Sequence, residues 1–300
     1  MFLIGSRSLP YYGDGYRRKI TKETDYDLIG DFNELNHLKS LGAVVNETNH
    51  QNKFCVVLDE SKIEFDATGN ESNLILASFS DEMKKIELFG LNVFVCTPKL
   101  NFIIKKSHLS SGVHFEKNFF DYLFLLKRFK NTELNETETL LYRVRKEEAE
   151  KRRISKINLN KKNEDFFEGG KSLRKYVHDD LHKAIAFHDN SPVYEKCKYD
   201  MSSAKIEKSL FEKLSSEDKL RMVQEEAMVI GLERFMIPTM DFSLNSTMVY
   251  RKGLMKLSRD LTKGWFQEFI FDNLLSLTEP SWDYMTKFKR ALDSEKIGRI

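Results

Sequence analysis

Two aspartates near the N-terminus are spaced for metal chemistry. Asp25 and Asp27 are separated by Tyr26 and followed by Leu28. In a strand, this alternation places both carboxylates on one face, roughly 6.5–7 Å apart along the chain. Carboxylates so placed can share divalent ions, which prefer oxygen ligands and can bridge nucleotide phosphates. The alternative for the same pattern is a charged edge strand.

The stretch before these acids predicts a phosphate-binding turn. Residues 2–4 are apolar and are followed by Gly5 and Ser6, a pattern typical of a buried strand that turns sharply into a helix. Glycine permits the tight turn, and Ser6 together with the free N–H groups of a helix start could hold a phosphate. Pro10 and the glycines at 13 and 15 indicate that this helix is short or interrupted.

A third acid follows on a later predicted strand. In residues 62–67, Glu64 and Asp66 share one face, and Asp66 is the first choice for a third carboxylate, with Glu64 second. Gly5-Ser6, Asp25-x-Asp27 and this strand, in that order, resemble the signature of the DNA polymerase β-like nucleotidyltransferases over about residues 1–130. The resemblance implies an α/β (α+β) fold in which helices flank a mixed sheet. The gap between Ser6 and Asp25 is longer than in that family.

The same resemblance implies a reaction. It predicts transfer of an NMP from an NTP such as ATP to a hydroxyl acceptor, with release of pyrophosphate. Mg²⁺ or Mn²⁺ would bind Asp25, Asp27 and Asp66, and the nucleotide would bind Gly5, Ser6 and Arg7. The acceptor is open among RNA, protein and a small molecule. The competing hypothesis is a catalytically inactive module of the same fold that binds a nucleic-acid or protein partner.

A later helix, after Thr97-Pro98, carries two adjacent lysines. Several branches of the superfamily have a lysine on such a helix, so Lys105 or Lys106 is expected to contact the triphosphate or the leaving pyrophosphate. His108 and Asp121 could support that lysine or the acids, although a helix-terminal hydrogen bond is the alternative for His108. Asp121 lies in an apolar helix, so it needs a partner.

The elements that must position these residues follow from periodicity and turn chemistry. A helix is expected over 31–41, capped by Asp31. Strands are expected over 43–45, 54–58, 62–67 and 91–95, with a hairpin turn at 59–61. Residues 70–89 are expected to be helical in part, and 265–277 are expected to contribute core side chains.

Overall charge excludes a polycation, since 48 basic residues face 46 acidic ones. A local basic excess makes 143–156 a possible nucleic-acid contact, or else a solvated helix in a basic linker over 131–170. Three scattered cysteines are too few for a disulfide framework. With no apolar run long enough to span a membrane and no N-terminal signal pattern, the sequence predicts a cytoplasmic protein without membrane partners.

Residues 171–300 are expected to form a mostly helical C-terminal domain with its own polar cluster. His178 and His182 are spaced i, i+4, which suits a transition metal. Glu226 and Glu233 lie two turns apart on a predicted helix and could complete that site. A buried polar network and a substrate-recognition surface are the alternatives.

Overall fold

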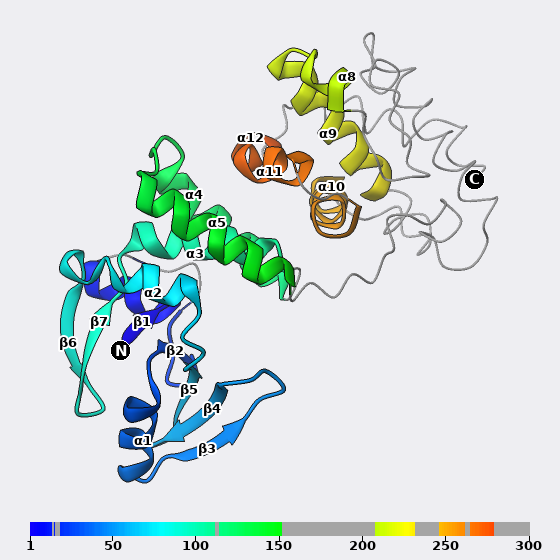
Figure 1. Cartoon of the computed structure of the whole chain (residues 1–300). Helices are drawn as coiled ribbons and strands as arrows, with labels where there is room; N and C mark the ends of the chain where they lie inside the picture. The colour runs from blue at the N-terminus through cyan, green and yellow to red at the C-terminus, as the bar shows by residue number, and fades with distance from the viewer. Residues whose placement is uncertain are drawn as a thin grey trace. The chain divides into compact units, whose positions relative to one another are not determined.

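The computed structural model describes residues 1–13, 15, 19–111, 114–151, 208–231, 246–261 and 265–278. The chain divides into two compact units, Met1–Arg153 and Ile154–Ile300, and Figure 1 follows the chain through both. The division falls inside the predicted linker over 131–170.

A seven-stranded mixed sheet in the order β3-β4-β5-β2-β1-β7-β6 forms the framework of the first unit. β1 is antiparallel to β2 and parallel to β7, while β2 is parallel to β5. The expected mixed α/β architecture is therefore confirmed. The strands are β1 (Phe2–Ile4), β2 (Tyr26–Ile29), β3 (Val44–Glu47), β4 (Lys53–Leu58), β5 (Ser61–Asp66), β6 (Lys84–Leu88) and β7 (Leu91–Val95).

One face of this sheet carries the hydrophobic core. Leu3, Leu28 and Ile63, from three neighbouring strands, are almost fully buried there together with Leu35 and Leu38 of helix α1 (Phe32–Ser40). Successive side chains of a strand point to opposite faces. The acids that alternate with this core set on β2 and β5 therefore lie on the opposite face of the sheet.

Local signals predicted several element ends correctly. Asp31 caps α1, since its side chain accepts a hydrogen bond from the Glu34 N–H. The Glu34 side chain accepts one from the Asp31 N–H, and the two bonds form a capping box. Asp59 and Glu60 both have positive φ, as a two-residue hairpin turn between twisted strands requires. Over 70–89, the sequence missed strand β6, which follows α2 (Glu71–Ala77) and a short 3-10 helix, η2 (Ser80–Glu82).

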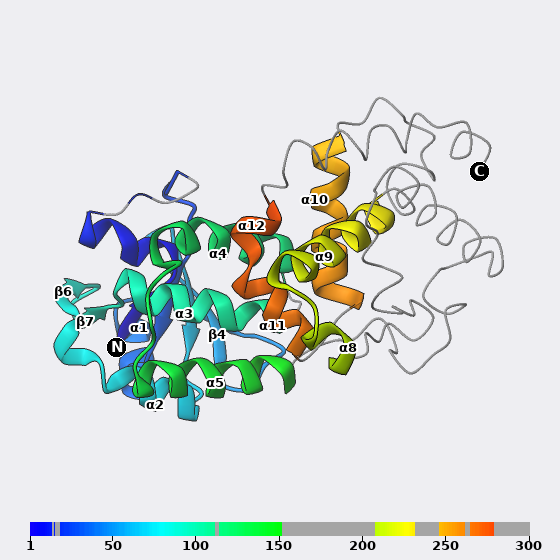
Figure 2. The same cartoon turned by 90° about the horizontal axis from the view of Figure 1, so that it is seen from above.

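Three helices complete the first unit: α3 (Pro98–Leu109), α4 (Phe115–Phe129) and α5 (Glu136–Lys151). They pack side by side, as the two views in Figures 1 and 2 show. Phe102 of α3 stacks on Tyr122 of α4, and Lys99 of α3 forms an ion pair with Glu138 of α5 at 2.8 Å. Helix α5 thus belongs to the first unit.

The second unit contains, among its described residues, helices only, in line with the expected helical domain. Helices α9 and α10 cross in close contact, because a Cβ at Gly253 would overlap the carbonyl oxygen of Ala227. Phe211 contacts the rings of Trp265 and Phe266, so the expected core role of 265–277 is confirmed. The elements are α8 (Lys208–Glu212), α9 (Ser216–Gly231), α10 (Ser246–Lys256), a π-helix η6 (Leu257–Leu261), α11 (Trp265–Asp272) and α12 (Leu274–Thr278).

The structure bears in part on two predictions from the sequence, one about membrane spans and one about the cysteines. Of the helices in the described ranges, none has the length and apolar character needed to cross a membrane. Cys55 and Cys96 carry free thiols, the first exposed and the second buried.

Candidate active site

The strand register brings Asp27 next to Glu64. Asp27 of β2 is the Cα partner of Glu64 on the parallel strand β5, and of Ile4 on β1. Partnered residues of neighbouring strands point to the same face and lie about 4.8 Å apart. Asp66 is paired with Ile29 instead. Ile29 lies two residues beyond Asp27 along β2, so Asp66 is further from Asp25 and from the C-terminal end of β1. Asp25, Asp27 and Glu64 therefore make the more compact set of acids.

Gly5 lies directly against Asp27. Its φ of 73° falls in the left-handed region, and a Cβ at this position would overlap Oδ2 of Asp27. Only glycine meets both conditions. The 3-10 helix η1 (Ser6–Tyr12) follows at once and contains Pro10, which agrees with the short helix expected after Gly5-Ser6.

A buried asparagine fixes this turn. The Gly5 N–H donates to Oδ1 of Asn101 at 2.8 Å, and Nδ2 of Asn101 donates to the Ser8 hydroxyl at 2.6 Å. The Ser8 hydroxyl in turn donates to the Gly5 carbonyl at 2.8 Å. Asn101 and Ser8 are almost fully buried. The amide of Gly5 is thus occupied and is not free for a phosphate, whereas Ser6 makes no side-chain hydrogen bond within the described residues.

The charge of Asp27 is held in an unfavourable environment. Burial raises the pKa of Asp27 to about 6; Lys105 and Lys117 oppose the rise, and the like charges of Glu64 and Asp25 add to it. Within the described residues, Asp27 accepts no hydrogen bond and forms no ion pair. A carboxylate crowded by other acids and short of donors is suited to a cation.

Two lysines from different helices act electrostatically on Asp27. Lys105 of α3 is largely buried, where its Nζ lies 3.2 Å from Oδ2 of Asp121 and donates to Oδ1 of Asn118 at 3.4 Å. Asp121, which is fully buried, therefore has the partner that the sequence led us to expect. Lys117 of α4 is exposed and lies one helical turn before Asp121.

Lys117 was missed from sequence. No motif in the sequence singled it out. The available signal was its spacing, because Lys117 and Asp121 are four residues apart and must share a helix face.

Other residues assigned to nucleotide binding are engaged elsewhere. Arg7 donates to the carbonyls of Thr21 and Thr24 at 2.9 and 2.7 Å, and its guanidinium lies 3.9 Å from the ring centroid of Tyr26. Arg7 thus anchors the loop that leads into β2. The Nζ of Lys106 lies 4.7 Å from the centroid of Tyr142 on α5, so it points away from Lys105 on the helix.

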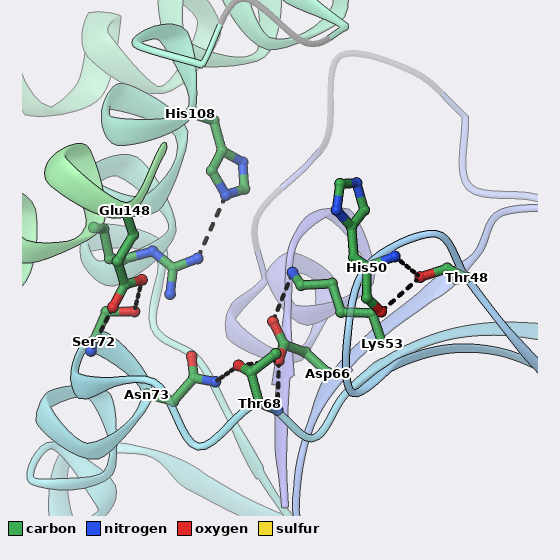
Figure 3. A network of polar contacts seen from close by, with 10 residues as sticks. Thr48, His50, Lys53, Asp66, Thr68, Ser72, Asn73, His108 and Glu148 are labelled. Carbon is green, nitrogen blue, oxygen red and sulfur yellow. Dashed lines mark hydrogen bonds and ion pairs between the residues drawn. The ribbon is translucent and has the colours of Figure 1, made fainter. Parts of the chain in front are cut away.

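Asp66 belongs to a separate polar network, shown in Figure 3. It forms an ion pair with Lys53 at 2.8 Å and accepts the Thr68 N–H at 3.0 Å. Although burial alone would raise the pKa of Asp66, Lys53 and Thr68 hold it below its ordinary value. Glu148 of α5 accepts from Ser72 in the same region. The first-choice third acid is therefore already neutralised by protein groups.

The basic stretch at 143–156 lies only partly within the described residues. Arg143 is exposed, Arg145 contacts Nε2 of His108 at 3.4 Å, and Lys146 pairs with Glu150 at 3.9 Å. Its last residues, from Arg152 onward, lie outside the described ranges. The stretch thus divides between an exposed side and a side turned toward α3.

The second predicted cluster lies mostly outside the described residues. His178, His182 and Glu233 fall there, whereas Glu226 is buried on α9. In the parts of the chain that the structure describes, no three His, Cys, Asp or Glu side chains are grouped closely enough to hold a metal ion as they stand.

Comparison with known proteins identifies a family. The model described as "Domain of unknown function (DUF7275)" matches residues 100–289, which is more than half of the chain, so the chain belongs to this family. No curated protein and no solved structure matches the chain. The match begins in α3, so it includes Asn101, Lys105 and Lys117 but leaves out the strands that carry the acids.

Proposed function

We propose that the protein is a metal-dependent nucleotidyltransferase with a DNA polymerase β-like fold in its first unit. It would transfer an NMP from an NTP to a hydroxyl acceptor and release pyrophosphate. One observation carries this proposal: Asp27 lies against the Gly5 turn, level with Glu64, and within the field of Lys105 and Lys117. A combination of acids with nearby lysines suits a metal-bound triphosphate.

The residues fit a divalent ion. Asp25, Asp27 and Glu64 offer carboxylate oxygens alone, which suits Mg²⁺ or Mn²⁺ better than softer metals. Burial and, to a lesser extent, the neighbouring acids raise the pKa of Asp27, and a bound cation would offset both effects. Mg²⁺ held there would neutralise phosphate charge and lower the pKa of the acceptor hydroxyl. We assign the third carboxylate to Glu64 and not to Asp66, since Asp66 is taken up by Lys53.

The two lysines have different roles in this proposal. Lys117 is exposed and so can move to the β- and γ-phosphates as a point charge. Lys105 is held by Asp121, so it supplies a fixed positive field that keeps Asp27 ionised. Ser6 offers a hydroxyl donor just beyond the end of β1, whose last residue, Ile4, is paired with Asp27.

A transfer assay tests the proposal. The full chain is incubated with each α-³²P-labelled NTP, Mg²⁺ or Mn²⁺, and cellular RNA and protein, beside Asp25→Ala/Asp27→Ala. Label that enters one fraction only with the intact acids supports the proposal and names the acceptor class. Absence of both transfer and metal-dependent NTP binding in the folded wild type would contradict it.

A second candidate function is a binding module that keeps the fold without catalysis. It is favoured by one observation: no three candidate ligands in the described residues are gathered for a metal as they stand. NTP binding that is unchanged by Mg²⁺ and by Asp27→Ala would select this function over the first.

A further inference from the structure

We propose that Asn101 is a positioning residue, which holds the Gly5–Ser8 turn where Ser6 can bind the nucleotide. This inference rests on the proposed nucleotidyl transfer. Asn101 hydrogen-bonds to Gly5, Ser8, Cys96 and Thr97 and to none of the three acids of the site, and no motif in the sequence marks it.

Three hydrogen bonds close a ring around the turn. The Gly5 N–H donates to Asn101, Asn101 donates to Ser8, and Ser8 donates back to the Gly5 carbonyl. The ring fixes both ends of a four-residue turn whose two middle residues, Ser6 and Arg7, remain outside it. A side-chain amide is the group that suits this place, because it accepts and donates side by side.

The same amide ties the turn to the sheet. Nδ2 of Asn101 also donates to the carbonyls of Cys96 and Thr97 at 3.2 and 3.1 Å, where β7 ends and α3 begins. Since β7 is parallel to β1, these carbonyls lie at the same end of the sheet as Gly5. The turn is therefore held against two strands and one helix.

This arrangement has a direct bearing on the site. Gly5 packs against the carboxylate of Asp27, so a turn that shifts outward would change the distance between Ser6 and the acids. Small displacements of a substrate-positioning group cost one or more orders of magnitude in rate or affinity. Lys105 lies one turn further along α3 from Asn101, which gives the turn and the lysine a common support.

A double-mutant cycle on NTP binding tests the inference. Filter binding of α-³²P-labelled ATP, CTP, GTP and UTP with Mg²⁺ is measured for the full chain and for Asn101→Leu, Ser8→Ala and Ser6→Ala, alone and combined. Asn101→Leu is expected to weaken binding of the preferred NTP about tenfold, and Ser8→Ala about threefold. Ser6→Ala should have an effect in the wild type but little further effect after Asn101→Leu, because coupled residues are not additive.

Ser107→Ala is the matched control. Ser107 is a buried serine of the same helix, and its hydroxyl donates to the Ile104 carbonyl one turn earlier, so its removal should leave NTP binding unchanged. If Asn101→Leu does not fold, the Ser8→Ala cycle decides alone. Folded variants that bind like the wild type, or that leave the Ser6→Ala effect undiminished, would overturn the positioning role. Wild-type protein that binds no NTP with Mg²⁺ would overturn the proposed function as well, so the two failures can be told apart.

Discussion

Asp27 and Asp66 lie on adjoining strands and face the same side of the sheet, yet their environments shift the carboxyl pKa in opposite directions. Burial and neighbouring acids raise the pKa of Asp27, while Lys53 and Thr68 lower that of Asp66. One carboxylate is left in need of a cation, and the other is satisfied by the protein. The difference teaches that strand alternation selects the face, whereas partners from other elements decide which acid is available for chemistry.

Substitution of the third acid is expected to have the largest effect on the rate of nucleotidyl transfer. Glu64→Gln should lower nucleotidyl transfer by about 10³-fold, since loss of a metal ligand removes several kcal/mol of transition-state stabilisation. Asp66→Asn should stay within about tenfold of the wild type. Steady-state transfer rates at saturating NTP measure both. Equal losses in the two variants would end the distinction between these acids.

Substitution of the two lysines near Asp27 should change the free energy of unfolding by different amounts. Lys105→Met removes the ion pair between Lys105 and the fully buried Asp121 and should lower the free energy of unfolding by about 3–5 kcal/mol. Lys117→Ala, at an exposed site, should change it by less than about 0.5 kcal/mol while weakening NTP binding about tenfold. Urea unfolding followed by circular dichroism and an NTP titration give the two numbers. Similar stability losses would mean that Lys105 is not the structural member.

Neutralising each aspartate should move thermal stability in opposite directions. The folded pKa of Asp27 is about 6 against an ordinary 3.8, so its contribution to stability falls as pH rises from about 4 to about 6 and stays unfavourable above that. Asp27→Asn should therefore raise the Tm at pH 7.5, by about 2–4 °C for each kcal/mol recovered, and leave it unchanged at pH 4. Metal-free protein must be used.

Asp66 supplies the counterpart of that experiment. Its pKa is lowered on folding, so its contribution is present above its ordinary pKa and is lost as pH falls through the folded value. Asp66→Asn should lower the Tm at pH 7.5, and the difference from wild type should shrink toward pH 3. Shifts of the same sign in both variants would show that the two environments are not opposed.

The smallest effect is expected at Lys106. Its ammonium lies over Tyr142, a contact on the order of 0.5–1 kcal/mol. Lys106→Ala should leave NTP affinity within about twofold of wild type, beside the larger loss in Lys117→Ala. A loss at Lys106 equal to that at Lys117 would place the triphosphate nearer to α5 than we propose.

Sequence alone was most successful where signals are local. The Asp31 cap, the hairpin turn at Asp59 and Glu60, and the strand that carries Asp27 all depend on residues within a few positions of one another. Strand β6 was missed because Lys84–Leu88 is an edge strand with partial exposure, so its apolar pattern is weak.

Prediction of the site would have required knowledge of contacts between residues far apart in the sequence. Glu64 and Asp66 share a face, and only the pairing of β2 with β5 tells which of them lies beside Asp27. Likewise, Lys105 and Lys106 differ by 100° around a helix, and the packing of α3 against α4 and α5 decides which one faces the acids. Asn101 carries no motif at all, since its role exists only once Gly5 and β7 are adjacent.

The start of the family match inside α3 has a practical consequence for expression of this chain. Leu100, Ile103 and Ile104 are buried in the first unit, and Asn101 accepts a hydrogen bond from Gly5, which follows β1 and precedes the matched segment. A polypeptide cut at residue 100 would therefore present an apolar helix face and an unpaired amide to water, and would be prone to aggregate. The matched segment is thus shorter than the unit in which its first helix packs, and expression of this chain should include β1.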